Sequence, residues 1–162
     1  MKEDNIYLDF DNRLKSSYLR NNGLKDENAK TMEELYFSII DDVDIVLNLL
    51  KIPSSKKGFK YWQDAVFIYI SANSSDISIC NQIYPAIAKK YEKTDRSVER
   101  AMRLCFENTL YNVSKYGKCP ISSFMYNYLI NPKNSEILSR ITELIVSKEF
   151  QEKKFKLKFM TN

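Results

Sequence analysis

The sequence contains no histidine, and its 162 residues include only three glycines, four prolines and three cysteines. Without histidine, the chain cannot build a Ser-His-Asp or Cys-His nucleophile, an imidazole general base or a histidine metal site. The cysteines, Cys80, Cys105 and Cys119, are odd in number and lack CxxC spacing, so neither a disulfide framework nor a zinc cluster is indicated. We therefore predict that the protein is not an enzyme, uses no cofactor or metal, and keeps its thiols reduced.

Long apolar runs are also missing. The longest, residues 65–70, is far shorter than the ~20 residues that a membrane-spanning helix needs, and Met1 begins an acidic rather than a signal-like segment. Hydrophobic residues make up 44% and charged residues 28%, which is a globular composition, and the scarcity of glycine and proline favours helices over a loop-rich β fold. We expect a soluble, cytoplasmic, all-α protein without a membrane partner.

The charge of the chain is unevenly distributed. Residues 1–50 contain 6 Lys and Arg against 11 Asp and Glu, whereas residues 51–162 contain 19 against 10. The net charge is therefore −5 in the first part and +9 in the second, although the total is only +4. The positive charge of residues 51–162 indicates a polyanionic partner.

Apolar side chains recur at helical spacing along most of the chain. Thr31 and Glu34 have capping-box spacing, Pro85 suits the first turn of a short helix, and Thr94 suits an N-cap. These signals predict helices over 5–20, 31–51, 59–72, 85–91, 95–113, 122–129 and 134–149. Within this all-α fold we predict an acidic helical extension (1–42), a helix-turn-helix effector-like domain (43–150) and a basic tail that frays (151–162).

The segment 85–113 has the pattern of a helix-turn-helix, because a three-residue turn separates its two helices. The second helix is apolar on one face and carries Arg96, Glu99, Arg100 and Arg103 on the other. An ordinary solvated face, with Glu99 and Arg103 as an i,i+4 pair worth ~0.3–0.5 kcal/mol, is the alternative interpretation. The surrounding cations favour a DNA-binding face. They are Lys56, Lys57, Lys89, Lys90 and Lys93.

In a complex with DNA, some of these side chains would contact bases and others would contact phosphates. The Arg100 guanidinium can bind guanine O6 and N7 together, and the Glu99 carboxylate can accept from a cytosine amino group, each good pair discriminating by ~1–3 kcal/mol. The other cations are better placed for phosphates, which fix the register of the protein on the duplex. This predicted phosphate set is Lys56, Lys57, Lys89, Lys90, Lys93, Arg96 and Arg103.

Residues 83–91, followed by 97–103, resemble the helix-turn-helix of the stage zero sporulation protein A family, the master response regulators of endospore formation. Residues 50–53, 57–59 and Tyr61 resemble the start of that family's effector domain, and 132–136 the entry to its last helix. Together these segments cover about 43–147. The resemblance implies a domain of about six helices that binds short G·C-containing promoter boxes, often as tandem copies, and contacts RNA polymerase.

Carried over by position, Glu99 and Arg100 match the base-reading pair of the family and Arg103 its next arginine. Two positions depart from the family: Ser97 stands where a basic residue is frequent, and Leu104 is apolar. The family also carries a receiver domain of roughly 120 residues before the effector domain, whereas about 42 residues precede it here. We therefore expect this protein to bind a promoter box of different sequence. We also expect its activity to be controlled without phosphorylation.

The acidic extension leaves several alternatives open. Its apolar stripe (Ile6, Phe10, Leu14 and Tyr18) packs either on its own domain or across a two-fold axis in a homodimer, or else the segment mimics DNA and occludes the basic face. Its aspartates are expected to form a solvated acidic face rather than a phosphorylation or metal pocket. They are Asp9, Asp11, Asp41, Asp42 and Asp44.

The leading functional prediction is a sequence-specific transcription regulator, related to sporulation, that binds double-stranded DNA and works without a receiver domain. The alternative is an interaction protein or anti-regulator that keeps the effector fold and binds a regulator or RNA polymerase. Arg100 and Glu99 favour the first prediction.

Overall fold

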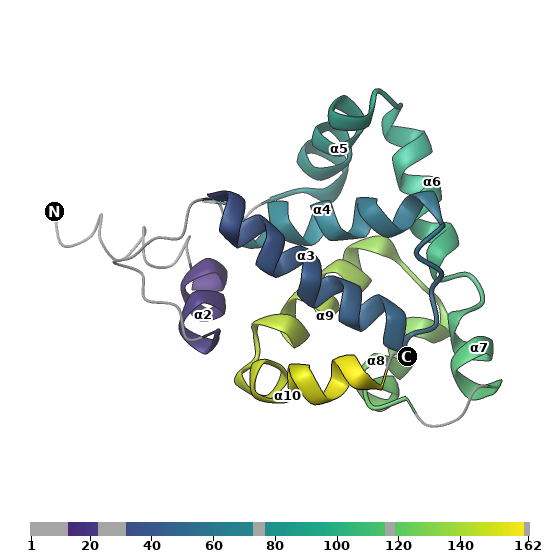
Figure 1. Ribbon diagram of the computed structural model, residues 1–162. Helices are drawn as coiled ribbons and strands as arrows, with labels where there is room; N and C mark the ends of the chain where they lie inside the picture. Colours follow the sequence, from purple (N-terminus) through teal and green to yellow (C-terminus); the bar gives the residue numbers. More distant parts are fainter. Residues whose placement is uncertain (1–12, 23–31, 73–76, 116–118, 161–162) are drawn as a thin grey trace, which may run out of the picture.

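The computed structural model describes residues 13–22, 32–72, 77–115 and 119–160. All regular elements in these residues are helices, so the all-α prediction is confirmed (Figure 1). In chain order they are α2 (Arg13–Asn21), α3 (Met32–Leu49), α4 (Lys57–Ser71), the π-helical turn η2 (Ile79–Ile83), α5 (Tyr84–Tyr91), α6 (Asp95–Cys105), α7 (Thr109–Lys115), α8 (Ser122–Ile130), α9 (Asn134–Val146) and α10 (Lys148–Phe159). The expected helical residues 5–12 and Thr31 lie outside the described part.

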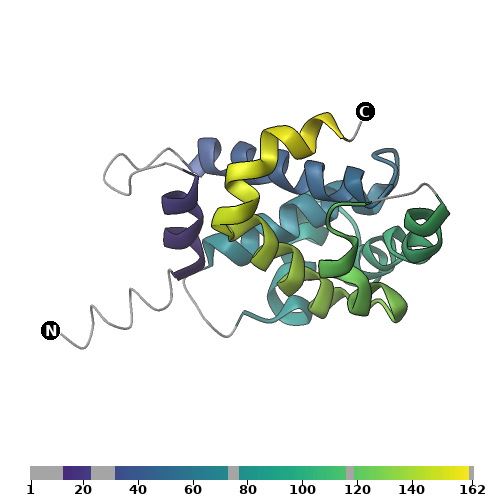
Figure 2. The same cartoon turned by 90° about the horizontal axis from the view of Figure 1, so that it is seen from below.

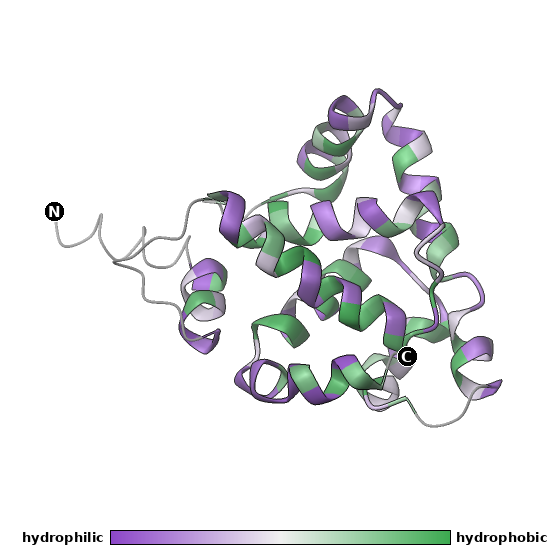
Figure 3. Cartoon of the chain, in the orientation of Figure 1, coloured by the Kyte–Doolittle hydropathy of each residue, from purple (hydrophilic) through white to green (hydrophobic). Residues whose placement is uncertain are grey.

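Helix α4 is the centre of the core, and α3, α6 and α9 pack around it. Trp62 is its largest side chain and is fully buried, with Val66 and Ile70 on the same inward face. Figure 3 shows hydrophobic colour concentrated where α3, α4 and α9 face one another. None of the described helices combines the length and the apolar character that a bilayer crossing requires.

Helix α2, which lies in the acidic extension, packs on its own chain. Tyr18 is fully buried, and its hydroxyl lies 2.7 Å from Ser38 Oγ and donates to Asp42 Oδ2 at 2.7 Å. Asn21 Nδ2 donates to the Val146 carbonyl at 2.7 Å, which ties α2 to the end of α9. Figures 1 and 2 both show α2 at the end of the molecule away from α6. This packing supports the capping alternative for α2.

Asp42 corrects the expectation of a solvated acidic face. Its side chain is buried between α2, α3 and α10, and it accepts hydrogen bonds from Tyr18, Gln151 and Lys154. Burial raises the pKa of Asp42 above its ordinary value, although the hydrogen bonds from Gln151 and Tyr18 oppose the shift. The aspartate therefore links helices from the two ends of the chain. Asp41 is exposed as expected, Asp44 is half-buried, and Asp9 and Asp11 lie outside the described residues.

The helix expected over 95–113 is two helices, α6 and α7. The indole Nε1 of Trp62 donates to the Met102 carbonyl at 2.9 Å, which is the carbonyl that the amide of Phe106 would use in a continuing helix. The Phe106 amide bonds to the Arg103 carbonyl instead, and its ring packs edge-on against Trp62 at 5.1 Å. A contact from α4, distant in sequence, therefore ends α6 at Cys105.

The C-terminal part also differs from the prediction. The last helix was expected to reach Glu149 and the tail to fray, but α9 ends at Val146 and α10 continues to Phe159. Ser147 separates them, because its extended backbone breaks the helix and its hydroxyl caps α10 by accepting from the Phe150 amide. Phe150 and Gln151 are buried and hold α10 against α3 and α9.

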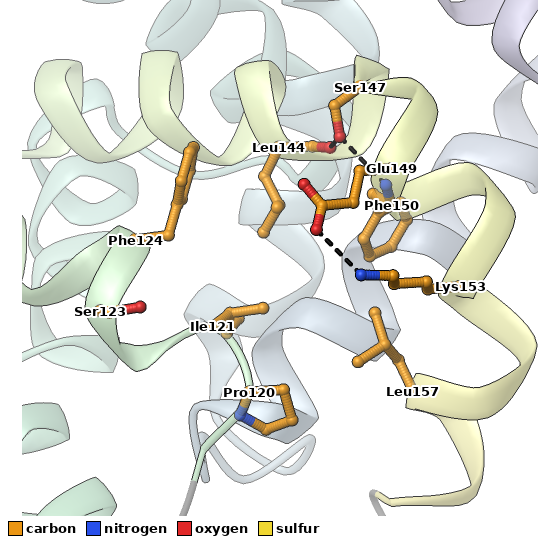
Figure 4. Close-up of a pocket in the computed structure, with 10 residues that line it drawn as sticks. All are labelled: Pro120, Ile121, Ser123, Phe124, Leu144, Ser147, Glu149, Phe150, Lys153 and Leu157. Atoms are coloured by element: carbon orange, nitrogen blue, oxygen red, sulfur yellow. Dashed lines mark hydrogen bonds and ion pairs between the residues drawn. The ribbon is translucent and has the colours of Figure 1, made fainter.

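A cavity of about 320 Å³ separates α10 from the segment that leads into α8. Figure 4 shows its mostly apolar walls, with Ile121 and Leu144 facing Phe150 and Leu157. An ion pair between Glu149 and Lys153 at 3.0 Å lies at its edge. The inner face of α10 is thus apolar even where it does not pack tightly.

Candidate nucleic-acid interface

The turn between α5 and α6 is closed by backbone hydrogen bonds. Glu92 adopts a left-handed backbone (φ 55°, ψ 49°), and the amide of Lys93 donates to the Ala88 carbonyl at 2.8 Å. Thr94 then caps α6, because its hydroxyl accepts from the Ser97 amide at 3.1 Å, as predicted. Pro85 lies in the first turn of α5, also as predicted. The two helices therefore meet in a tight, defined turn at the top of Figure 1.

The left-handed backbone at Glu92 leads to the first prediction. A non-glycine residue in this region is strained by roughly 1–2 kcal/mol, because its Cβ crowds the carbonyl oxygen. We expect Glu92→Gly to raise the free energy of unfolding by about 0.5–1 kcal/mol, less than the strain because glycine loses more backbone entropy. Urea denaturation followed by circular dichroism measures the change.

Glu92→Gln is the matched control for this substitution. Glutamine keeps the side chain and the strain but removes the charge, so we expect the stability to stay within about 0.5 kcal/mol of the original. Equal stabilisation by glycine and glutamine would mean that the charge of Glu92, and not its backbone, limits stability.

Helix α6 is fixed against α4 by close contacts. A Cβ built on Gly58 would meet the backbone carbonyl of Ala101 and the Cys105 thiol, so glycine permits the close approach of the two helices. Trp62 donates to the Met102 carbonyl, and Lys56 Nζ donates to the Leu104 carbonyl at 3.2 Å. Burial raises the pKa of the Cys105 thiol to about 11, so this thiol is not a reactive group at neutral pH.

Helix α9 holds the helix-turn-helix from the other side. Asn134, the first residue of α9, is buried, and its Nδ2 donates to the Tyr84 hydroxyl at 3.0 Å and to the Glu99 carbonyl at 3.1 Å. Tyr84 begins α5 and Glu99 lies in α6. One amide group thus binds both helices of the motif, while its Oδ1 is buried without a partner among the described residues. The orientation of α5 and α6 is therefore set by α4 and α9 together.

The outer face of α6 carries the predicted base-reading residues. Arg96 and Arg100 are exposed and, within the described residues, have no hydrogen-bond or ion-pair partner. Glu99 Oε1 accepts from Arg103 Nε at 3.0 Å, so the i,i+4 pair considered above as the alternative is present. The pair neutralises the glutamate within the cationic face and leaves Arg96 and Arg100 able to bind anionic or acceptor groups.

Most of the predicted phosphate-binding cations lie around α6. Lys89 and Lys93 are exposed at the end of α5 and in the turn. Lys56 and Lys57 line a groove of about 380 Å³ that is completed by Gly58, Ala101, Leu104 and Glu107. The start of α4 is therefore brought beside α6, although 38 residues lie between Lys57 and Arg96 in the sequence.

Lys90 has a different environment from the rest of that set. Its ammonium bonds both carboxylate oxygens of Asp64 at 3.1 Å and the Tyr36 hydroxyl at 2.9 Å, and Tyr91 also donates to Asp64. Burial lowers the pKa of Lys90, but the hydrogen bonds with Tyr36 and Asp64 outweigh it and raise the pKa above its ordinary value. Asp64 is buried, so this cluster joins α3, α4 and α5 around one carboxylate.

The sequence pattern did not single out the residues that position the motif. Asn134 and Asp64 fall in their helices without a local signal for a distant partner. Lys133, the exposed residue before α9, is a further cation beside α6, because Asn134 contacts Glu99. One feature of the sequence indicates that Lys133 belongs to this interface. Lys133 lies between Pro132 and Asn134, in a segment that resembles the family.

The arrangement offers cationic and hydrogen-bond donor groups on a rigid helix. Among the residues that the structure describes, no group of three or more His, Cys, Asp or Glu side chains is placed to hold a metal ion. An exposed helix with unpaired arginines and flanking lysines fits a groove of a polyanionic duplex.

The family model described as "Sporulation initiation factor Spo0A C terminal" matches residues 43–145. The matched segment begins within α3 and ends within α9, and it contains α4, α5 and α6 in full. No solved structure matches the chain.

Proposed function

This chain belongs to the family of the sporulation initiation factor Spo0A C-terminal domain, and from that premise we propose that it is a sequence-specific DNA-binding transcription regulator. The family is that of the DNA-binding domain of a sporulation regulator. The observation that carries the proposal for this chain is the outer face of α6, where Arg96 and Arg100 are exposed and have no partner among the described residues. We assign no catalytic role to the protein.

The roles of the side chains follow from their places around α6. Arg100 reads guanine, and Glu99 accepts from cytosine with the oxygen that Arg103 does not occupy. Lys90 acts by holding α5 against α3 and α4 through Asp64 rather than by direct phosphate contact. The phosphate contacts come from the remaining predicted cations, with Lys133 added. They are Lys56, Lys57, Lys89, Lys93, Arg96, Arg103 and Lys133.

The extension contributes in a different way. Helix α2 packs on α4 and α9 at the end of the molecule away from α6, so we propose that it stabilises the effector domain rather than covering the DNA-binding face. Self-association through residues 1–42 and contact with RNA polymerase belong to the same proposal.

The second candidate is an interaction protein that keeps the effector fold but does not read DNA. The ion pair between Glu99 and Arg103 favours it, because such a pair is typical of a solvated helix face. This candidate predicts that Glu99 and Arg100 are indifferent to the sequence of any duplex that the protein meets.

Equilibrium binding to two duplexes over a range of salt concentrations distinguishes the two functions. One duplex carries a G·C-containing box of the family type, and the other has the same bases in scrambled order. A regulator should prefer the box, and log K should fall linearly with log salt at a slope of about −0.9 for each phosphate contact. Equal, weak binding of both duplexes at every salt concentration would support the interaction protein instead.

A further inference from the structure

Helix α10 carries large apolar side chains on both of its faces. Phe150 is buried on the inner face, and Leu157 is partly buried beside it. On the outer face, Phe155 is 72% exposed and Phe159 is 77% exposed, one helical turn apart. Adjacent large apolar side chains that stay exposed are typical of an interaction surface. The outer face of α10 is therefore an uncovered surface.

Lysines surround these two phenylalanines. The sequence of α10, KEFQEKKFKLKF, contains five lysines and two glutamates. Lys148 and Lys156 are exposed on the side of α10 that carries the phenylalanines. Lys148 pairs with the exposed Glu152 at 3.8 Å, whereas Lys156 has no ion-pair partner among the described residues. We call Lys148, Phe155, Lys156 and Phe159 the α10 face. Its charge and its aromatic centre fit a partner that is acidic and apolar.

Helix α3 presents a surface with the opposite charge. Phe37 is 54% exposed, and Glu33 and Asp41 lie one turn before and one turn after it, so the three side chains form one stripe. Within the described part of the chain, neither Glu33 nor Asp41 forms an ion pair. Burial raises the pKa of Asp44, the neighbouring Asp41 raises it further, and Lys158 of α10 opposes the shift. We call Glu33, Phe37 and Asp41 the α3 face.

We propose that the α10 face of one copy binds the α3 face of a second copy. Each face has an exposed phenylalanine centre. The unpaired charges beside these centres are opposite in sign among the described residues, because they are Lys156 on α10 and Glu33 and Asp41 on α3. The two faces cannot meet within one chain, because α10 already packs on α3 through Asp42, Gln151 and Lys154 while Phe37, Phe155 and Phe159 stay exposed. The contact is heterologous, so it joins copies head to tail rather than across a two-fold axis.

This inference rests on the self-association that is part of the proposed function, since the α3 face belongs to the extension 1–42. It adds that the extension of one copy binds the α10 face of another copy, and that the contact is head to tail. It does not depend on the DNA-binding face, because α10 and α6 share none of the residues concerned.

Sedimentation velocity of the full chain, without DNA, tests the proposal. We expect concentration-dependent association at low salt that weakens as salt screens the flanking charges. The double variant Phe155→Ala/Phe159→Ala and the single variant Phe37→Ala should each be monomeric under the same conditions. A 1:1 mixture of these two variants should form dimers and nothing larger, because one intact face remains on each copy.

Tyr126→Ala/Ile130→Ala is the matched control. These residues are a pair of exposed apolar side chains one turn apart on α8, 51% and 58% exposed, and their removal should leave association unchanged. The Arg100→Ala variant should also self-associate like the original chain. This result would distinguish failure of the present inference from failure of the proposed DNA recognition.

Three results would overturn the proposal. The first is a full chain that stays monomeric at all concentrations in low salt. The second is a mixture that contains no more dimer than each variant alone. The third is a monomeric chain that binds vesicles of anionic phospholipid through Phe155 and Phe159, which would identify a membrane surface as the partner of the α10 face.

Discussion

Replacing Gly58 with alanine is expected to lower the free energy of unfolding by about 1–3 kcal/mol, the range for overpacking a tight contact. An added Cβ would lie 2.6 Å from the Ala101 carbonyl carbon and 2.6 Å from Cys105 Sγ, and closer still to the Ala101 oxygen. The sulfur belongs to a side chain, but the carbonyl belongs to the backbone of α6. Relief therefore requires that α6 move away from α4.

The same substitution should reduce specific DNA binding more than its effect on stability would suggest. Moving α6 disturbs the Trp62 to Met102 and Lys56 to Leu104 hydrogen bonds, which fix the orientation of the reading face. Stability is measured by urea denaturation, and binding by titration of a box duplex at a temperature where the variant is folded. Lys57→Ala, one residue earlier and exposed, is the control and should change stability by less than about 0.5 kcal/mol.

A Gly58→Ala variant as stable as the original chain would show that α4 and α6 tolerate a wider separation. In that case the close approach at Gly58 would not be what positions α6.

Replacing Arg100 with alanine should weaken binding to the preferred duplex by ~1–3 kcal/mol, about 5- to 150-fold, and leave binding to a scrambled duplex nearly unchanged. Arg100 is exposed and lacks an intramolecular partner among the described residues, so its loss should not alter the fold. The change in affinity therefore reports the lost contact with DNA. Fluorescence anisotropy with both duplexes at one salt concentration measures it.

Lys89→Ala is the comparison for this prediction. Lys89 is also an exposed cation of the motif, but a phosphate contact carries no sequence information, so both duplexes should lose affinity to the same extent. If Arg100→Ala also weakens both duplexes equally, Arg100 binds phosphate and the assignment of base reading to it is wrong.

The local features of the fold were predictable because local sequence signals determine them. The capping hydroxyl of Thr94, the position of Pro85 and the apolar stripe of α3 each act within a few residues. The helix-turn-helix and its exposed arginine face follow from such signals. The predicted roles of Glu99 and Arg100 stay predictions, since the structure gives their positions and not their ligands.

The differences arise where a distant residue determines the local structure. Trp62 ends α6 by taking the Met102 carbonyl, and no glycine or proline marks that point in the sequence. Asp42 looked like a surface aspartate because its partners Tyr18 and Gln151 lie in helices far away along the chain. In the sequence, Lys90 resembles the other cations of the motif, but in the structure its ammonium is bonded to Asp64. In each case a long-range hydrogen bond decides the outcome, and helical periodicity carries no information about it.

Selection of bound duplexes from a random pool tests the central claim most directly, because it assumes no box in advance. With the full chain, the proposed function predicts enrichment of a short motif containing at least one G·C pair that Arg100 reads, and loss of preference at that pair when Arg100→Ala is used. An unenriched pool over a range of salt concentrations, from a folded protein, would contradict the claim that α6 reads DNA sequence.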